Sequence, residues 1–170
     1  MTLAQRIRDC AQLHGEFKLR SGKISDTYFG KYLFESDPVL LRDICEEMAT
    51  RLPVDTEVLA GLEMGGIPVV TVLSQVTGLP CAFLRKEPKA YGTCKYAEGP
   101  DLTGKRFVMI EDVVSSGGAI LDQLKLLAGD RLTPTAIVCV IDRQTGGVEN
   151  LADAGYELRS VLTMADILSA

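Results

Sequence analysis

The side chains best suited to chemistry follow one short apolar run. Phe107–Ile110 is followed directly by two acids, Glu111 and Asp112, and then by Val-Val and a Ser-Ser-Gly-Gly turn at residues 115–118. A glycine-rich turn that opens a helix presents unpaired backbone N–H groups to an anion, and serine hydroxyls add donors without adding charge. We therefore expect a phosphate group to bind over residues 115–119.

The acid pair before this turn needs a different partner. Carboxylates at positions 111 and 112 would repel a phosphate unless they faced another group. Ribose hydroxyls and a bridging Mg²⁺ ion are the natural partners of such carboxylates. On local sequence alone, a tight connection between a strand and a helix with a solvated acid pair remains an alternative.

Two other glycine-containing segments resemble anion sites to different degrees. Gly61–Pro68, with the sequence GLEMGGIP, also connects an apolar run to a helical stretch, and its backbone amides could hold a second anion, although a plain connection explains it nearly as well. Gly99–Lys105 matches the pattern G-x-x-x-x-G-K, but Arg106 stands where a nucleotide P-loop has Ser or Thr. That segment also precedes a strand instead of following one, so we do not interpret it as a P-loop.

Alternating apolar runs and helical stretches must position these groups. The expected strands are residues 57–61, 81–84, 106–110, 135–141 and 156–162, and the expected helices between them are 66–77, 118–128 and 148–154. Near-continuous apolar strands that alternate with helices predict an α/β fold with a mostly parallel sheet covered on both faces. In such sheets, ligands bind beyond the carboxyl ends of the strands, where the acids and the turn would lie.

The two ends of the chain carry shorter elements. Helical spacing of apolar residues predicts a helix over 2–14 that ends at Gly15, and His14 is expected only to end it, because no orienting partner for a catalytic base lies nearby. Extended segments are expected at 17–19 and 27–34, joined by a turn at 21–22. Asp37 is expected to cap the next helix, with Pro38 at its first position, and residues 163–166 resemble a capped short helix.

One interval breaks the regular alternation. Residues 86–105 contain three glycines, two prolines and four lysines, with few apolar residues. Loops of this length are uncommon in compact domains. The composition predicts a flexible functional loop or a solvated surface excursion.

Composition excludes several classes of protein. The 170 residues are 46% hydrophobic with a net charge of −5, which is typical of one globular domain and excludes a disordered chain. A pI of about 4.9 disfavours duplex nucleic acid as a partner.

Five cysteines without a C-x-x-C pair indicate reduced thiols, and a single histidine disfavours a zinc site. No signal peptide or apolar run long enough for a membrane span is present, so we expect a cytoplasmic protein that does not bind membranes.

The central segment resembles a known motif. Val108–Ala119 is similar to the phosphoribosyl pyrophosphate (PRPP) binding motif of type I phosphoribosyltransferases. Three more segments resemble orotate phosphoribosyltransferases in particular: Phe17–Phe29, Gly61–Pro68 and Arg85–Gly92. The pair Asp142-Arg143 matches as well. Because these segments follow the family's order, the chain is identified as a member of that family.

The resemblance implies a fold and a reaction. The fold would be the type I phosphoribosyltransferase fold in a single domain, with a small base-binding hood made by residues 1–35 and the C-terminal end, and a flexible loop. In the reaction, N1 of orotate displaces pyrophosphate from C1 of PRPP, which gives orotidine 5′-monophosphate in pyrimidine biosynthesis. The family implies Mg²⁺ as the cofactor, bound mainly through PRPP, and a homodimer with shared active sites.

The resemblance also assigns roles to residues that bind PRPP. The 5′-phosphate would be held by Ser115, Ser116, Gly117, Gly118 and Ala119. Glu111 and Asp112 would receive the ribose 2′- and 3′-hydroxyls, and the turn Glu63-Met64-Gly65 would hold pyrophosphate. The residues near the leaving group would be Arg85, Lys86, Lys89 and Tyr91. Among these, the catalytic set would be Lys89, Lys86 and Arg85 together with Asp112, with Arg85 and Lys89 reaching a neighbouring subunit's site.

Orotate requires a cation for its carboxylate and flat surfaces for its ring. Arg143 offers the planar fork that binds a carboxylate through two hydrogen bonds. The resemblance places Lys23, Tyr28, Phe29 and Ser115 around the same base.

The chain departs from part of the family at three positions. Some members carry lysine where this chain has Ile24 and Gly65, and histidine where it has Tyr91. The first two differences remove cations from the site and place more weight on the cations at 85, 86 and 89. Tyrosine is neutral near pH 7, so position 91 would not act as a cation here.

Two other functions remain open on sequence alone. A phosphoribosyltransferase for a purine or another base would share residues 108–119 and differ in the base pocket. Arg143 and Lys23 discriminate between the two, because a neutral purine substrate has no carboxylate to pair with them. A regulatory protein that senses PRPP without catalysis is the second alternative. A regulator of nucleic acid would be expected to carry a basic surface or an added DNA-binding segment, and neither is evident in the sequence.

Overall fold

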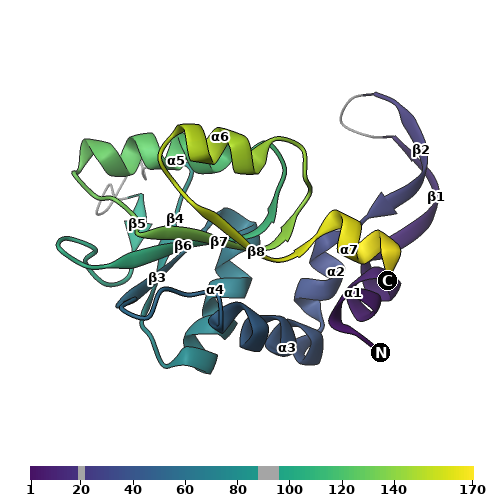
Figure 1. Cartoon of the computed structure of the whole chain (residues 1–170), viewed down its shortest axis with the longest axis horizontal. Coiled ribbons are helices and arrows are strands. Elements are labelled where there is room, and N and C mark those ends of the chain that lie inside the picture. Colours follow the sequence, from purple (N-terminus) through teal and green to yellow (C-terminus); the bar gives the residue numbers. More distant parts are fainter. Residues whose placement is uncertain (19–21, 88–95) are drawn as a thin grey trace.

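A six-stranded sheet forms the centre of the molecule in the computed structural model, which describes residues 1–18, 22–87 and 96–170 (Figure 1). The strand order is β5-β4-β3-β6-β7-β8, with β5 antiparallel to β4 and the other neighbours parallel. The strands are β3 (Val58–Leu62), β4 (Cys81–Leu84), β5 (Ala97–Glu98), β6 (Phe107–Val114), β7 (Ala136–Asp142) and β8 (Leu158–Thr163).

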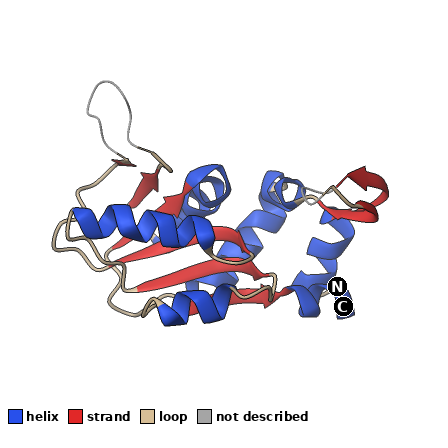
Figure 2. Ribbon diagram, turned by 90° about the horizontal axis from the view of Figure 1, so that it is seen from above, coloured by secondary structure: helices blue, strands red, loops and turns tan. Residues whose placement is uncertain are grey.

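Helices cover both faces of this sheet (Figures 1 and 2). One face packs against α3 (Pro38–Ala49) and α4 (Glu63–Thr77), and the other against α5 (Gly118–Gly129) and α6 (Gly147–Asp153). Every residue of β3 and β7 is buried, as expected for strands covered on both faces. The predicted α/β fold with a mostly parallel sheet between helices is therefore confirmed.

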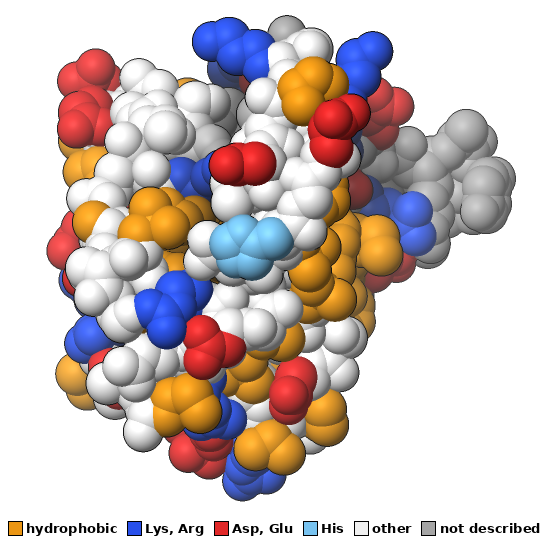
Figure 3. Space-filling view, turned by 90° about the vertical axis from the view of Figure 1, so that its right-hand side faces the viewer, with side chains coloured by type: hydrophobic (Ala, Val, Ile, Leu, Met, Phe, Trp, Pro, Cys, Tyr) orange, Lys and Arg blue, Asp and Glu red, His pale blue; other side chains and the backbone are white. Residues whose placement is uncertain are grey.

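A smaller group of elements lies beside one end of the sheet. It contains α1 (Leu3–Ala11), the antiparallel strands β1 (Gln12–Lys18) and β2 (Ile24–Phe29), α2 (Lys31–Ser36) and α7 (Met164–Ser169). Helix α7 contacts α1, so the C-terminal end joins the N-terminal elements (Figure 1). We call this group the hood. Seen from this end, hydrophobic side chains are exposed around the chain's one histidine (Figure 3).

Two local predictions for the hood were wrong. Residues 12–14 belong to a strand and not to the first helix, because β1 pairs with β2 and aligns His14 with Thr27. The helix instead ends at Ala11. Residues 31–34 are helical instead of extended, because a helical turn after Gly30 carries the Phe34 side chain into the core, where it has no exposed surface. Tertiary pairing and burial override local preference at both places.

The other elements agree with the sequence to within a few residues. Asp37 caps α3 by accepting hydrogen bonds from the backbone N–H groups of Val39 and Leu40. Thr163 and Asp166 form a capping box on α7. Strand β6 is longer than expected and ends at Val114, so both acids lie within it. In the interval 86–105, residues 97–98 form β5, and residues 88–95 lie outside the described part of the chain.

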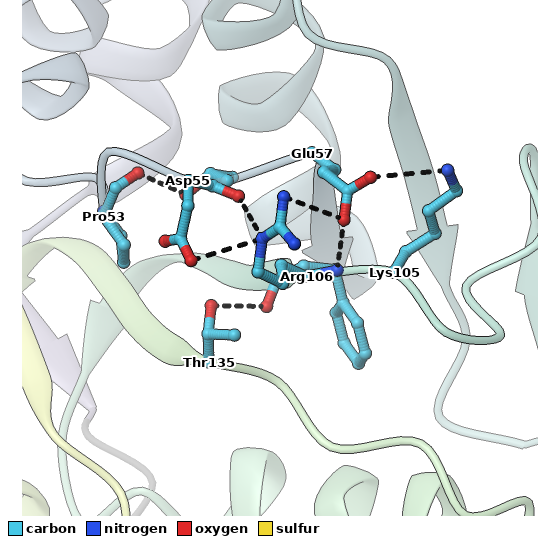
Figure 4. A network of polar contacts seen from close by, with 8 residues as sticks. Pro53, Asp55, Glu57, Lys105, Arg106 and Thr135 are labelled. Atoms are coloured by element: carbon cyan, nitrogen blue, oxygen red, sulfur yellow. Dashed lines mark hydrogen bonds and ion pairs between the residues drawn. The ribbon is translucent and has the colours of Figure 1, made fainter.

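A polar network ties together the amino ends of β3 and β6 (Figure 4). The guanidinium of Arg106 lies 3.2 Å from the Asp55 carboxylate and 3.4 Å from that of Glu57. Glu57 also accepts a hydrogen bond from the backbone N–H of Arg106 and pairs with Lys105 at 3.4 Å. Since the two strands are parallel, this network lies at the opposite end of β6 from the acid pair.

No helix within residues 1–18, 22–87 and 96–170 is both long enough and apolar enough to cross a lipid bilayer.

Candidate active site

Two adjoining cavities open at the carboxyl end of β6. The smaller, about 180 Å³, is formed by Glu111 and residues 113–120. The larger, about 940 Å³, lies between the hood and the sheet. Val113 and Ser115 line both cavities, so a ligand that occupies one can extend into the other. This is the edge of the sheet at which the sequence predicted ligand binding.

The smaller cavity has the features expected of a phosphate site. Ser115 and Ser116 are exposed, and Gly117 precedes α5 with a φ of 76°, in the left-handed region that glycine adopts without strain. The first N–H groups of a helix lack intrahelical acceptors and can bind an anion. The Nδ2 of Asn150 on α6 donates a hydrogen bond to the Ser116 carbonyl over 2.9 Å and holds the turn from behind. No local pattern pointed to Asn150, because it lies 34 residues from Ser116 in the sequence.

Glu111 and Asp112 lie on opposite faces of the sheet, because successive side chains alternate along strand β6. Glu111 is partly buried and lines the smaller cavity. Asp112 lines neither cavity, and its side chain has no exposed surface. Burial, followed by the contact with Asp112, raises the pKa of Glu111 well above its ordinary value. The sequence predicted one role for both acids, but the structure gives them different surroundings.

Asp112 is held by groups from three elements. The ammonium of Lys31 on α2 lies 2.6 Å from its Oδ2, and the backbone N–H of Val113 donates to its Oδ1 over 2.5 Å. The Cα of Gly65 on α4 is packed against the same carboxylate. Burial raises the pKa of Asp112, whereas hydrogen bonds from Glu111, Glu35 and Lys31 lower it, and the net shift is downward. Asp112 is therefore ionised at neutral pH.

Glu35 completes this cluster and was not predicted. It lies four residues after Lys31 in α2 and is buried, with 7% of its surface exposed. Burial and then the neighbouring Asp112 raise the pKa of Glu35 to about 9. Glu35 is therefore protonated at neutral pH and can donate a hydrogen bond to Asp112. The i, i+4 spacing of Lys31 and Glu35 was the available signal, but we expected residues 27–34 to be extended.

The second glycine turn lies at the start of α4, next to the end of β4. Glu63 has a φ of 53°, which is uncommon for a residue with a side chain. Its carboxylate accepts a hydrogen bond from the backbone N–H of Lys86. The structure thus brings together two segments that the resemblance assigns to pyrophosphate, 63–65 and 85–86. Met64, Arg85 and Lys86 are exposed, whereas Lys89 and Tyr91 lie outside the described residues.

The larger cavity contains most of the residues expected to surround the base. Tyr28, Phe29, Ser115 and Arg143 line it. The rings of Phe17 and Tyr28 are 5.4 Å apart and tilted by 31°. The backbone N–H of Arg143 donates to the Val114 carbonyl over 2.8 Å, which fixes the start of the loop that follows β7.

Among the lysines of the hood, the structure differs from the expectation. Lys23 is exposed and lines neither cavity. Lys18 and Lys31 line the larger one, and neither was singled out from the sequence. Lys18 lies at the end of β1, and Lys31 lies at the start of α2.

The donor set does not fit a resident metal ion. Within the described residues, no group of three or more His, Cys, Asp or Glu side chains is arranged to hold a metal. Of the two acids in β6, Asp112 is already paired with Lys31.

Comparison with known proteins identifies the family. Residues 40–156 match the phosphoribosyl transferase domain family. An orotate phosphoribosyltransferase from Nocardioides sp. is 47% identical over 169 residues, which cover 99% of this chain and 94% of the relative.

Solved structures show the same similarity. Orotate phosphoribosyltransferase from Mycobacterium tuberculosis, in complex with Fe(III) dicitrate, superimposes with a TM-score of 0.85 at 26% identity and covers 97% of this chain and 96% of its own. The same M. tuberculosis enzyme in complex with PRPP gives a TM-score of 0.82 at 25% identity, with 97% and 96% covered. Together with the site described above, these similarities place the chain in the phosphoribosyltransferase family, among the orotate phosphoribosyltransferases.

Proposed function

We propose that the chain transfers the phosphoribosyl group of PRPP to N1 of orotate, giving orotidine 5′-monophosphate and pyrophosphate. The observation that carries this assignment is the pair of adjoining cavities that share Val113 and Ser115. One cavity has the backbone and hydroxyl donors that a phosphate requires, and the other contains aromatic rings and Arg143. A ribose bound beside Val113 and Ser115 would have its 5′-phosphate in the smaller cavity and the base in the larger one.

The residues assigned to PRPP follow from this placement. The turn at 115–119 would bind the 5′-phosphate, and Glu111, which lines the phosphate cavity, would accept hydrogen bonds from ribose hydroxyls. Asp112, assigned to the same hydroxyls by the resemblance, would reach them once its ion pair with Lys31 opens. The turn at 63–65 and the neighbouring Arg85 and Lys86 would face the pyrophosphate.

Charge explains how such a site accelerates the reaction. As the bond between C1 and the pyrophosphate oxygen lengthens, its electron pair leaves with pyrophosphate, and the ribose ring becomes positive. The lone pair of orotate N1 forms the new bond to C1, so no covalent enzyme intermediate is required. Cations near the leaving group stabilise this transition state more than the ground state. Arg85 and Lys86 supply such cations within the described residues, and we assign Lys89 to the same role.

On the base side, Arg143 would bind the orotate carboxylate. Its guanidinium can donate two parallel hydrogen bonds to the two carboxylate oxygens. This pairing attracts the negative charge of orotate and also fixes the orientation of the orotate ring. Tyr28 and Phe29 would provide flat surfaces against the ring, and we retain Lys23 as a proposed contact. A neutral purine has no carboxylate, so Arg143 favours orotate over a purine.

We assign Mg²⁺ to the substrate and not to the protein. PRPP carries phosphate and pyrophosphate oxygens, which are the ligands that Mg²⁺ prefers. The chain itself has no suitable group of ligands within the described residues. Mg²⁺ would therefore enter the site bound to PRPP, and the protein residues described above would contact PRPP and orotate directly.

Two further properties complete the proposal. We infer a homodimer with shared active sites, in which Arg85 and Lys89 reach the neighbouring site, and we infer a cytoplasmic location. Both inferences are supported by membership of the family.

A spectroscopic assay tests the function. Purified protein is mixed with PRPP, Mg²⁺ and orotate, and the loss of orotate absorbance is followed. We expect turnover with orotate and none with adenine or hypoxanthine. Turnover with a purine instead would assign the chain to another phosphoribosyltransferase, and PRPP binding without turnover of any base would favour the PRPP sensor.

A further inference from the structure

Lys31 lies between a fully buried carboxylate and the larger cavity, to which we assign the base and which we call the base cavity below. Its side chain is 35% exposed and lines the larger cavity, while its ammonium lies 2.6 Å from Oδ2 of Asp112, whose side chain is 0% exposed. The ring of Tyr32 lies beside the ammonium, with its centroid 5.1 Å away. Asp112 therefore has no direct contact with the larger cavity, and Lys31, which lines the cavity, is the side chain between them.

The buried side of the pair is rigidly enclosed. A Cβ on Gly65 would lie 2.5 Å from Oδ2 of Asp112, so the carboxylate occupies the space that a side chain at position 65 would fill. The backbone N–H of Val113 holds the other oxygen over 2.5 Å. Because Asp112 is fixed from several directions, it can fix the flexible lysine side chain in turn.

The net charge of the cluster leaves the lysine able to attract an anion. Three carboxyl groups, those of Glu35, Glu111 and Asp112, surround one ammonium. Burial and the proximity of Asp112 raise the pKa of Glu35 to about 9, so Glu35 holds its proton at neutral pH. The same two causes raise the pKa of Glu111 well above its ordinary value. Asp112 is then the carboxylate that directly faces the Lys31 ammonium, at 2.6 Å. An ammonium has three N–H donors, and pairing with Asp112 leaves others for a ligand.

The position of Lys31 decides which ligand it would meet. The cavity that it lines also contains Arg143, and the carboxylate that holds it is packed against the turn at 63–65. Lys31 therefore lies where the base cavity approaches the turn assigned to pyrophosphate.

We propose that Lys31 binds an oxyanion of the substrates, either the pyrophosphate of PRPP or the carboxylate of orotate, and that Asp112 is the positioning residue that fixes its ammonium for this contact. This inference rests on the proposed function for the identity of the substrates. While the pair with Lys31 is closed, Asp112 contributes to binding through Lys31, and a direct contact with ribose, which requires the pair to open, is the competing role that additive effects would indicate.

Kinetics of single and double variants test the proposal. We expect Lys31→Met to raise the KM for one substrate by about tenfold or more, since a hydrogen bond to a charged group is being removed. Lys31→Arg, which keeps the charge, should recover most of that loss. Asp112→Asn should raise the same KM, and the double variant should be little worse than either single variant, because the two residues act as one unit. A rise in the KM for PRPP identifies pyrophosphate as the ligand, whereas a rise in the KM for orotate identifies its carboxylate.

Controls separate a defect in binding from one in folding. Lys31→Met leaves Asp112 buried without its cation and can unfold the chain, but the double variant Lys31→Met with Asp112→Asn removes that buried charge. Lys125→Met breaks a comparable pair with Asp122, 2.9 Å long, on the exposed surface of α5, and should change neither KM.

Two results would overturn the inference while the wild-type protein uses orotate. One is an unchanged KM for both substrates in Lys31→Met, and the other is full additivity of the Lys31 and Asp112 effects. If the wild-type protein does not use orotate, the proposed function fails instead. Calorimetry with pyrophosphate alone then decides the inference: weaker binding to Lys31→Met than to the wild-type protein supports it, and equal binding contradicts it.

Discussion

The Cα of Gly65 faces the carboxylate of Asp112 so closely that a methyl group on Gly65 would lie 2.5 Å from Oδ2 and 2.6 Å from Oδ1. The first turn of α4 and the acid of β6 therefore share one space. A residue with a side chain at position 65 would have to displace Asp112 from its place beside Lys31, so the Lys31–Asp112 arrangement of this chain requires glycine at 65.

Replacing Gly65 with alanine should damage catalysis. The new Cβ would push the Asp112 carboxylate away from Lys31, and misplacement of about 1 Å at an active site can cost on the order of 10² in rate. We expect kcat/KM for PRPP to fall by about that factor. The matched control is Gly129→Ala on α5, where a Cβ would meet nothing within 4 Å. Equal activity of the two variants would show that the contact between Gly65 and Asp112 is unimportant.

Arg143 should control the affinity for orotate. Arg143→Gln removes the charge and the fork, and loss of hydrogen bonds to a charged group corresponds to a rise in the KM for orotate of about 10- to 100-fold. Arg143→Lys keeps the charge without the fork, so we expect an intermediate value. Arg42→Gln, on the exposed face of α3, serves as the control. A KM for orotate that stays at the wild-type value in Arg143→Gln removes this residue from the base site.

The raised pKa of Glu35 should make stability depend on pH. Between its ordinary value of 4.5 and about 9, folded Glu35 keeps a proton that the unfolded chain has released. The folded state therefore binds more protons in this window, and the free energy of unfolding falls as pH rises, by up to about 1.4 kcal/mol per pH unit for one proton.

Glu35→Gln isolates this effect, because glutamine keeps a hydrogen-bond donor and does not titrate. Denaturant unfolding at pH 5.5 and pH 8 should show a smaller loss of stability in the variant than in the wild-type chain. Glu149→Gln on α6, an exposed position, should keep the wild-type slope. If Glu35→Gln loses as much stability as the wild-type chain between these pH values, Glu35 is not protonated in the folded state.

Removal of metal should abolish activity without destabilising the protein. We expect EDTA to stop turnover and added Mg²⁺ to restore it, because the ion arrives with PRPP. The melting temperature of the chain without substrate should be the same with and without EDTA, since only a ligand that binds the folded state raises it. A large drop in melting temperature with EDTA would instead indicate a resident metal.

The sequence predicted the parts of the fold that depend on local pattern. The buried strands of the sheet, the Asp37 cap and the Ser-Gly turn all have signals within a few residues, and each is present in the structure. The hood was predicted less well, because β1 exists only through its pairing with β2, and α2 only through the burial of Phe34.

The same limit applies to the site. Ser115 could be found from the local pattern of an apolar run, an acid pair and a Ser-Gly turn, and Arg143 from the resemblance of the Asp142-Arg143 pair to the family; each directly follows a strand. Lys31 and Glu35 share helical i, i+4 spacing, but nothing in the sequence connects them to Asp112, and Asn150 has no local signal, because these partners lie 34 or more residues away. A contact between elements distant in the chain has no signature in a single sequence, and charge clusters built from such contacts require a structure.

Calorimetry with PRPP tests the central claim most directly, namely that the turn at 115–119 and the acid Glu111 form a site for this sugar phosphate. In the presence of Mg²⁺, we predict saturable binding to the wild-type chain and much weaker binding to Gly117→Val, whose side chain is strained at a φ of 76°. Absence of detectable PRPP binding to the folded wild-type chain would contradict the account.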